Sequence, residues 1–183
     1  MTRIALALLM LAGCGKKSPS NDQPAARAGS GSSAAPAPAA ATPEPPPGNG
    51  LAVTDHETPE FSGRYDKVFA QLRHDEHKTV VAFVRDCPEL TCETGAWVPE
   101  DVAHVCPKAF IATLTIDGEQ PVTQRTTVLA LAGPAEHAAT ATIAEVVVDL
   151  TAVGNDGVSG TAAVENRDAA VRGSFHAEVC PLQ

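Results

Sequence analysis

The chain has 183 residues, of which 44% are hydrophobic and 19% are charged, and its formal net charge at pH 7 is −9. The acidic residues concentrate in residues 51–183, whose formal charge is −11. Such a body repels phosphate backbones and anionic lipid headgroups, which argues against nucleic-acid binding. No stretch reaches the roughly 18 apolar residues that a spanning helix needs.

The N-terminus has the features of an export leader. Arg3 supplies a short positive region, and Ile4–Leu11 form an apolar segment of eight residues. Leu11 to Cys14 then read LAGC. This motif resembles the lipobox of bacterial lipoproteins, whose cysteine receives diacylglycerol before the leader is removed. The resemblance implies a signal peptide over residues 1–13 and a lipidated Cys14, and the alternative is a plain secretory signal that ends in cysteine by chance.

The lipobox resemblance also implies a location. Mature bacterial lipoproteins carry two or three fatty acyl chains, such as palmitate, and more than one chain is needed for stable anchoring. Gly15 follows the cysteine. In the sorting rule of enteric bacteria, aspartate at this position retains a lipoprotein in the inner membrane. We therefore expect a lipid-anchored protein of the cell envelope, a compartment that includes the periplasm, held at the outer membrane rather than the inner one; the face of the membrane is left open.

Residues 14–50 have the composition of a disordered linker. Residues 15–50 contain eight prolines, no aromatic residue and only five charged residues. This composition buries too little apolar surface to offset the entropy of ordering. A flexible coil of this length reaches roughly 33 Å. We expect a spacer between the lipid and the folded domain.

Residues 51–183 have the apolar content of one packed domain. Apolar runs or apolar–polar alternation predict strands over residues 61–72, 78–86, 110–117, 122–132, 144–151 and 171–179. The first of these segments also fits a helix, but its β-rich surroundings favour a strand. The run Val80–Val84 suits a strand that is buried on both faces. Between 154 and 157, Gly-Asn-Asp-Gly predicts a hairpin, because these residues tolerate a positive φ.

Six or seven antiparallel strands with short turns predict an all-β domain, either a small sandwich or an up-and-down barrel. Sequential strands should then be neighbours in space. The ending Gly173–Cys180, with Leu90–Glu93 earlier in the chain, resembles a group of uncharacterised β-rich bacterial lipoproteins that close on a G-x-F-x-A-x-x-C strand. That resemblance implies a β-domain and no known activity.

Four cysteines remain when Cys14 is set aside, and they are Cys87, Cys92, Cys106 and Cys180. An even number in an exported domain predicts two disulfides. Three connectivities are possible. We expect one bond between Cys180 and the 87–106 cluster and the other within that cluster. A zinc site formed by the first three cysteines and His104 is the alternative, but its spacing departs from that of structural zinc sites.

The segment His74-Asp75-Glu76-His77 is the densest cluster of candidate metal ligands. On a helix, His74 and His77 would share a face. The cluster lies between two predicted strands, where an exposed charged turn is expected in any case. Metal binding by His74 and His77 is therefore the second hypothesis, and no cofactor is expected.

The sequence lacks the usual catalytic and nucleotide-binding motifs. It contains no P-loop, dinucleotide fingerprint or H-E-x-x-H, and Gly157-Val158-Ser159-Gly160 lacks the G-x-S-x-G frame of hydrolases. We expect a non-enzymatic module for binding or envelope assembly, whose partner is an envelope protein or a small ligand. The alternatives are a metal- or small-ligand-binding lipoprotein and, third, a hydrolase assembled from residues far apart in sequence.

Overall fold

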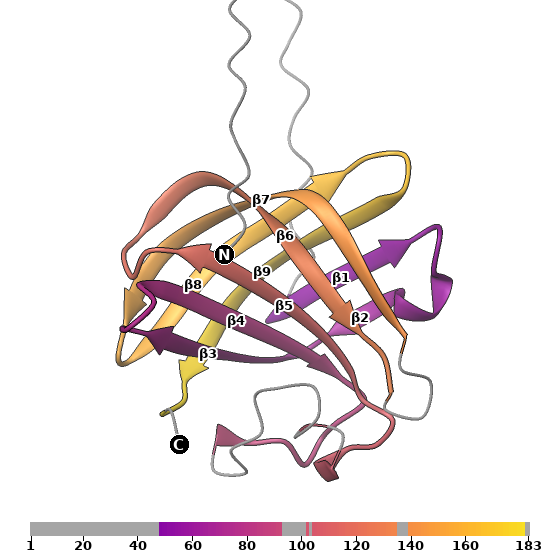
Figure 1. Cartoon of the computed structure of the whole chain (residues 1–183), viewed down its shortest axis with the longest axis horizontal. Coiled ribbons are helices and arrows are strands. Elements are labelled where there is room, and N and C mark those ends of the chain that lie inside the picture. The colour runs from indigo at the N-terminus through magenta and orange to yellow at the C-terminus, as the bar shows by residue number, and fades with distance from the viewer. Residues whose placement is uncertain (1–47, 93–101, 103, 135–138, 182–183) are drawn as a thin grey trace, which may run out of the picture. The chain divides into compact units, whose positions relative to one another are not determined.

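The computed structural model describes residues 48–92, 102, 104–134 and 139–181 (Figure 1). The leader, Cys14 and most of the expected linker lie outside the described residues. The described part forms nine strands and one 3-10 turn, which are β1 (Gly50–Asp55), η1 (Pro59–Phe61), β2 (Gly63–Tyr65), β3 (Lys67–Arg73), β4 (Lys78–Arg85), β5 (Phe110–Asp117), β6 (Val122–Ala132), β7 (Thr140–Gly154), β8 (Gly157–Glu165) and β9 (Ala169–Val179).

Seven of these strands close into a barrel. From β3 to β9 each strand pairs antiparallel with the next along the chain, and β9 returns to β3. An alternating up-and-down order of seven strands brings the first and last together in the same direction, so this closing seam must be parallel. It is also short, with Phe69 opposite Glu178 and Ala70 opposite Val179.

β1 and β2 form an extension on the barrel. β1 pairs antiparallel with the first half of β9, from Gly50 opposite Ser174 to Asp55 opposite Ala169, and β2 pairs with the other edge of β1. Figure 1 shows this pair of short strands beside the long strands of the barrel. The chain therefore enters the domain next to its last strand, about 120 residues away in sequence.

The prediction of an all-β domain is confirmed, and its barrel alternative is the one observed. Strands occupy all six predicted segments, and the hairpin at Asn155-Asp156 joins β7 to β8. The segment 61–72 is divided between β2 and β3, and β7 is longer than the predicted 144–151. β1 was not predicted.

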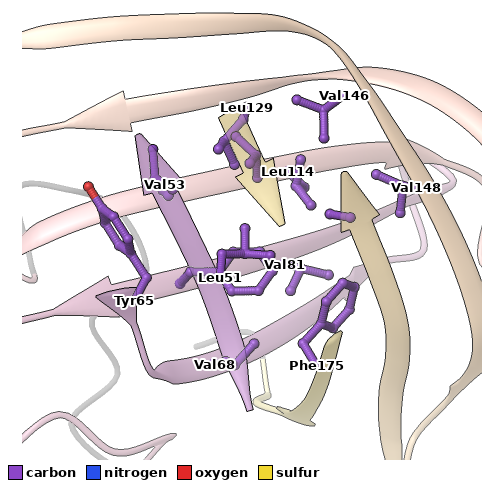
Figure 2. Packing of buried hydrophobic residues seen from close by; sticks show 14 of the residues in the cluster. Leu51, Val53, Tyr65, Val68, Val81, Leu114, Leu129, Val146, Val148 and Phe175 are labelled. Carbon is purple, nitrogen blue, oxygen red and sulfur yellow. The ribbon is translucent and has the colours of Figure 1, made fainter. Parts of the chain in front are cut away.

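The barrel interior is filled by apolar side chains from alternate strand positions (Figure 2). Leu114, Val148 and Phe175 are among them. Phe83 meets Phe175 edge to face, with ring centroids 5.2 Å apart. Side chains normally fill the lumen of a barrel this small. A ligand would therefore meet this protein on its outer surface or at an end of the barrel.

A second apolar cluster covers the outside of β3, β4 and β5. Its members are Phe69, Val84, Cys87, Leu90, Val102, Cys106, Ala109, Ile111 and Cys180. They come from outward positions of the three strands, from the connection between β4 and β5 and, in the case of Cys180, from the end of β9. This cover explains why β4 is buried on both faces, as the run Val80–Val84 predicted: Val81 and Phe83 point into the barrel, and Val84 points into the second cluster.

Two disulfides hold the second cluster together. Cys87 is bonded to Cys106 and Cys92 to Cys180, with Cα–Cα separations of 5.5 and 5.2 Å. The expected partition, with one bond inside the 87–106 segment and one to Cys180, is the one observed. The second bond ties the end of β9 to the β4–β5 connection, beside the short parallel seam.

Tyr65 is buried where β2 meets the end of the barrel. Its hydroxyl donates a hydrogen bond of 2.9 Å to the carbonyl of Phe61. Burial raises the pKa of this hydroxyl from 10.0 to about 12, although the positive charge of Arg85 lowers it. The Arg85 guanidinium lies 4.0 Å above the Phe110 ring and donates to the carbonyls of Glu60 and Ser62. These contacts hold η1 and β2 against β4 and β5.

Because Tyr65 is the only tyrosine of the chain, its ionisation can be measured directly. We expect tyrosinate absorbance of the folded protein to rise near pH 12 rather than near pH 10. The unfolded chain releases this proton at the lower pH, so the free energy of unfolding should fall by about 2–3 kcal/mol as the pH rises from 10 through 12. Tyr65→Phe should remove both the absorbance change and this part of the pH dependence. Ionisation near pH 10 in the folded chain would contradict the burial.

Candidate functional site

The segment 74–77 forms the exposed turn between β3 and β4, as the turn interpretation predicted. The His77 backbone has a positive φ of 52°, and its carbonyl accepts a 2.7 Å hydrogen bond from the Gly118 N–H. The Thr79 hydroxyl donates to the Gly118 carbonyl at 2.8 Å. These bonds hold the β3–β4 turn against the β5–β6 turn, which lies at the same end of the barrel.

His74 is bound by a residue of that second turn. Its Nδ1 lies 2.6 Å from Oε2 of Glu119. The His74 side chain is 67% exposed and that of Glu119 is 23% exposed. Among the described residues, His74 and His77 do not belong to a group of three potential metal ligands. The structure therefore joins His74 to a carboxylate 45 residues away instead of to His77.

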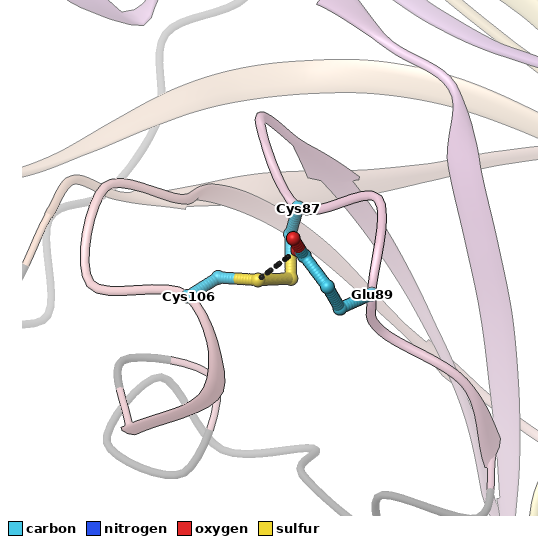
Figure 3. Close-up of a disulfide and its surroundings, with 3 residues drawn as sticks. All are labelled: Cys87, Glu89 and Cys106. Carbon is cyan, nitrogen blue, oxygen red and sulfur yellow. Dashed lines mark hydrogen bonds between the residues drawn. A yellow bond between two sulfur atoms is a disulfide. The ribbon is translucent and has the colours of Figure 1, made fainter.

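The zinc alternative built on the cysteines is wrong in this oxidised structure. Cys87, Cys92 and Cys106 are all in disulfides, so their sulfurs are not the thiolates that zinc binds. Figure 3 shows the Glu89 carboxylate beside the Cys87–Cys106 bond, with its Oε2 3.4 Å from the sulfur of Cys106. His104 is exposed in a helical turn before Cys106.

A groove of about 380 Å³ lies on the outer face of β7, β8 and β9. Its floor consists of outward-facing small side chains, including Val147, Thr161 and Ala163. Arg172 forms an ion pair with Glu165 at the wall of the groove. Two of its other lining residues, Gln124 and Asp149, are hydrogen-bonded to each other.

The contact between Gln124 and Asp149 depends on a bulge in the pairing of β6 with β7. Asp149 accepts the backbone N–H of Gln124 at 2.6 Å and its side-chain amide at 3.1 Å. Gln124 has a positive φ of 52°. Both oxygens of the carboxylate are thus engaged within the protein, and Arg172 is neutralised by Glu165. The groove presents an apolar floor between internally paired charges.

Ser159 and His176 face each other across β8 and β9 on the exposed surface. The Ser159 hydroxyl lies 2.8 Å from Nδ1 of His176. The Asn49 side chain accepts the His176 N–H at 2.7 Å and donates to its carbonyl at 3.0 Å. Gly157 leaves room for the imidazole, because a Cβ there would lie 2.9 Å from the ring. Sequence reasoning missed this pair, since the two residues belong to separate segments.

The Ser159–His176 contact has the two groups of a nucleophile and its base, but a hydrolytic site also needs an orienting group and a place for the oxyanion. Among the hydrogen bonds of the described residues, no carboxylate contacts the His176 ring. The pair is equally an ordinary cross-strand hydrogen bond on an exposed sheet. The geometry of the Ser159–His176 contact is therefore not sufficient to assign a hydrolytic site.

Comparison with known proteins gives no further constraint: no family model, no curated protein and no solved structure matches the chain. Within the described residues, no helix has both the length and the apolar character to cross a membrane. The function must therefore be argued from the sequence motif at Cys14 and from the surface of the barrel.

Proposed function

We propose that this chain is a lipoprotein of the bacterial cell envelope, anchored by lipid on Cys14, whose barrel serves in binding or envelope assembly and not in catalysis. The observation that carries the proposal is the distribution of its five cysteines. The two disulfides use the four cysteines of the barrel, which leaves Cys14, in the LAGC motif, as the one without a disulfide partner there.

The two disulfides also support an extracytoplasmic location, because such bonds persist in oxidising compartments. The acidic barrel has little attraction for anionic headgroups, so lipid on Cys14 is the feature that would hold it to a membrane. The Pro- and Ala-rich residues 15–50 would then set the distance between that membrane and the barrel. An outer-membrane location is favoured by Gly15.

The role in binding or assembly rests on the shape of the barrel. Its interior is packed with side chains, so a partner would meet the outer face or the turns. The charged residues that line the outer groove are paired within the protein, Asp149 with Gln124 and Arg172 with Glu165. Interaction through a preformed surface fits this arrangement better than a reaction that needs free acid and base groups.

Cys14→Ser tests the anchor. The wild-type protein should be in the membrane fraction of its own cells and should incorporate a fatty-acid label. Cys14→Ser should lose the label, because the thioether to diacylglycerol needs the sulfur of this cysteine. Cys180→Ser is the control. It removes a disulfide of the barrel but should keep the label and stay in the membrane fraction, because a loss of folding does not remove lipid from Cys14. A fatty-acid label that persists in Cys14→Ser would refute the proposal.

A serine-directed fluorophosphonate tests the non-enzymatic part of the proposal. We expect Ser159 to react no faster than Ser174, an ordinary serine on the same outer face of the sheet. Rapid labelling that Ser159→Ala and His176→Ala both abolish would show an activated nucleophile. That result would favour the hydrolase alternative over a binding module.

A further inference from the structure

The end of the barrel where the β3–β4 and β5–β6 turns meet joins two ligand types from separate segments. His74 Nδ1 comes from the first turn, and the Glu119 carboxylate, 2.6 Å away, comes from the second. The turns are fixed to each other by the backbone bond from Gly118 to His77 and by the Thr79 hydroxyl. The positions of His74 and Glu119 are thus set by the fold and do not depend on a single mobile loop.

The second oxygen of Glu119 is the unexplained feature of this end. Its Oε1 is buried and accepts no hydrogen bond from the described residues. A buried carboxylate oxygen without a partner is unfavourable, and in native proteins such an atom commonly marks a bound ion or water. The contact with His74 satisfies Oε2 only. The carboxylate therefore has the capacity for one more cationic partner.

We propose that His74 and Glu119 together bind a divalent transition-metal ion of the zinc type. Imidazole nitrogen and carboxylate oxygen are both ligands of Zn²⁺, at about 2.0–2.2 Å. In a tetrahedral site these distances place two ligand atoms about 3.3 Å apart. An ion between Nδ1 and Oε2 would replace their hydrogen bond, so the His74 ring must withdraw by about 0.7 Å. Its side chain is 67% exposed and can make this movement. The unpartnered Oε1 belongs to the same carboxylate and would bind the same ion as its second oxygen.

The charges around this pair favour a cation. Asp75 and Asp117 lie on or beside the same two turns. Glu76 is shared by Arg73 and Lys78, at 3.5 and 3.0 Å, so those two cations are engaged within the β3–β4 hairpin. Two protein ligands leave the other metal positions to water, so the site would exchange its ion readily instead of holding the fold together.

Titration of the metal-free chain with ZnCl2 tests the proposal. Calorimetry measures the affinity, and the NMR signals of the histidine rings report which histidine binds. The wild type should bind one Zn²⁺ with a dissociation constant below about 1 mM. The NMR signals of the His74 ring should shift before those of the other histidines. His74→Ala and Glu119→Gln should each weaken binding at least about tenfold. His77→Ala is the matched control, being a histidine on the same exposed turn, and it should bind as the wild type does.

The remaining outcomes overturn the proposal. Equal loss of zinc affinity in His74→Ala and His77→Ala would show that these two histidines bind the ion, as the sequence alone suggests. Binding of Ca²⁺ that depends on Glu119 but not on His74 would indicate a carboxylate site for hard cations. Zinc binding that neither His74→Ala nor Glu119→Gln weakens would be adventitious. Unchanged amide spectra in each variant verify that these exposed substitutions leave the fold intact.

Discussion

Replacing Cys92 and Cys180 with alanine is expected to destabilise the barrel by about 4.6 kcal/mol, because their bond constrains a segment of 88 residues in the unfolded chain. The bond between Cys87 and Cys106 spans only 19 residues, and its removal should cost about 3.2 kcal/mol. Loop-closure entropy grows with the logarithm of length, so the difference is modest. It still corresponds to about a tenfold change in the unfolding equilibrium.

The position of the Cys92–Cys180 bond adds to its effect. β9 closes the barrel on β3 through two residue pairs and one further bond, from the Cys180 N–H to the Ala70 carbonyl at 2.9 Å. Without the disulfide, that bond and the end of β9 would open more readily. Most domains are stable by about 5–15 kcal/mol, so the double variant should be close to unfolding at 37 °C.

Urea unfolding followed by circular dichroism measures this prediction. Cys87→Ala with Cys106→Ala is the matched control, since it also removes one disulfide from the same apolar cluster. The two double variants should have similar slopes and different midpoints, with the lower midpoint for Cys92 and Cys180. If the control is the less stable variant, closure of the β9–β3 seam does not depend on the disulfide.

The sequence predicted those parts of the fold in which a local pattern reports burial. Val171–Val179 alternates because one face of β9 packs into the barrel and the other meets solvent. Val80–Val84 is continuous because β4 packs on both faces. The division of the cysteines between a local and a distant bond was also predictable, since Cys180 is remote from the other three. The strand patterns depend on residues that are close in sequence, and the cysteine pairing depends on the number and spacing of the cysteines.

The closure of the sheet into a barrel could not be predicted from the local sequence pattern. Whether the strands form a sandwich or a barrel depends on the β9–β3 seam, where only Phe69 and Ala70 of β3 pair. β1 escaped prediction because it is six residues long and its partner on β9 lies about 120 residues away. Such pairings are set by the whole topology, and no periodicity in either segment reports them.

The contact between His74 and Glu119 falls between these two cases. Residues 74–77 were predicted as a turn, and residues 118–121 lay between two other predicted strands, so the sequence did not relate the two segments to each other. In an up-and-down meander, alternate hairpins lie at the same end, so the β3–β4 and β5–β6 turns had to be near each other once the strand order was accepted. The sequence alone directed attention to His77, because on a helix it would share a face with His74. The turn conformation removed that relation.

Gly173→Ala is expected to destabilise the protein by about 3 kcal/mol or more, because the new methyl group would meet backbone. Gly173 lies on β9, opposite Leu51 of β1. A Cβ at Gly173 would lie 2.1 Å from the carbonyl oxygen of Gly50 and 2.8 Å from the Leu51 side chain. A side chain could turn away, but the Gly50 carbonyl belongs to the strand. β1 would have to move off β9 as a unit.

The Gly173→Ala substitution should also disturb the residues that precede β1. Displacing β1 would also shift Asn49, whose side chain binds both backbone groups of His176. Gly154→Ala is the matched control, because a Cβ there meets nothing within 4 Å, and stability should change by at most about 1 kcal/mol. Urea midpoints compare the two variants. Equal midpoints would mean that β1 is not held closely against β9, and that the N-terminal segment is attached to the barrel more loosely than this pairing requires.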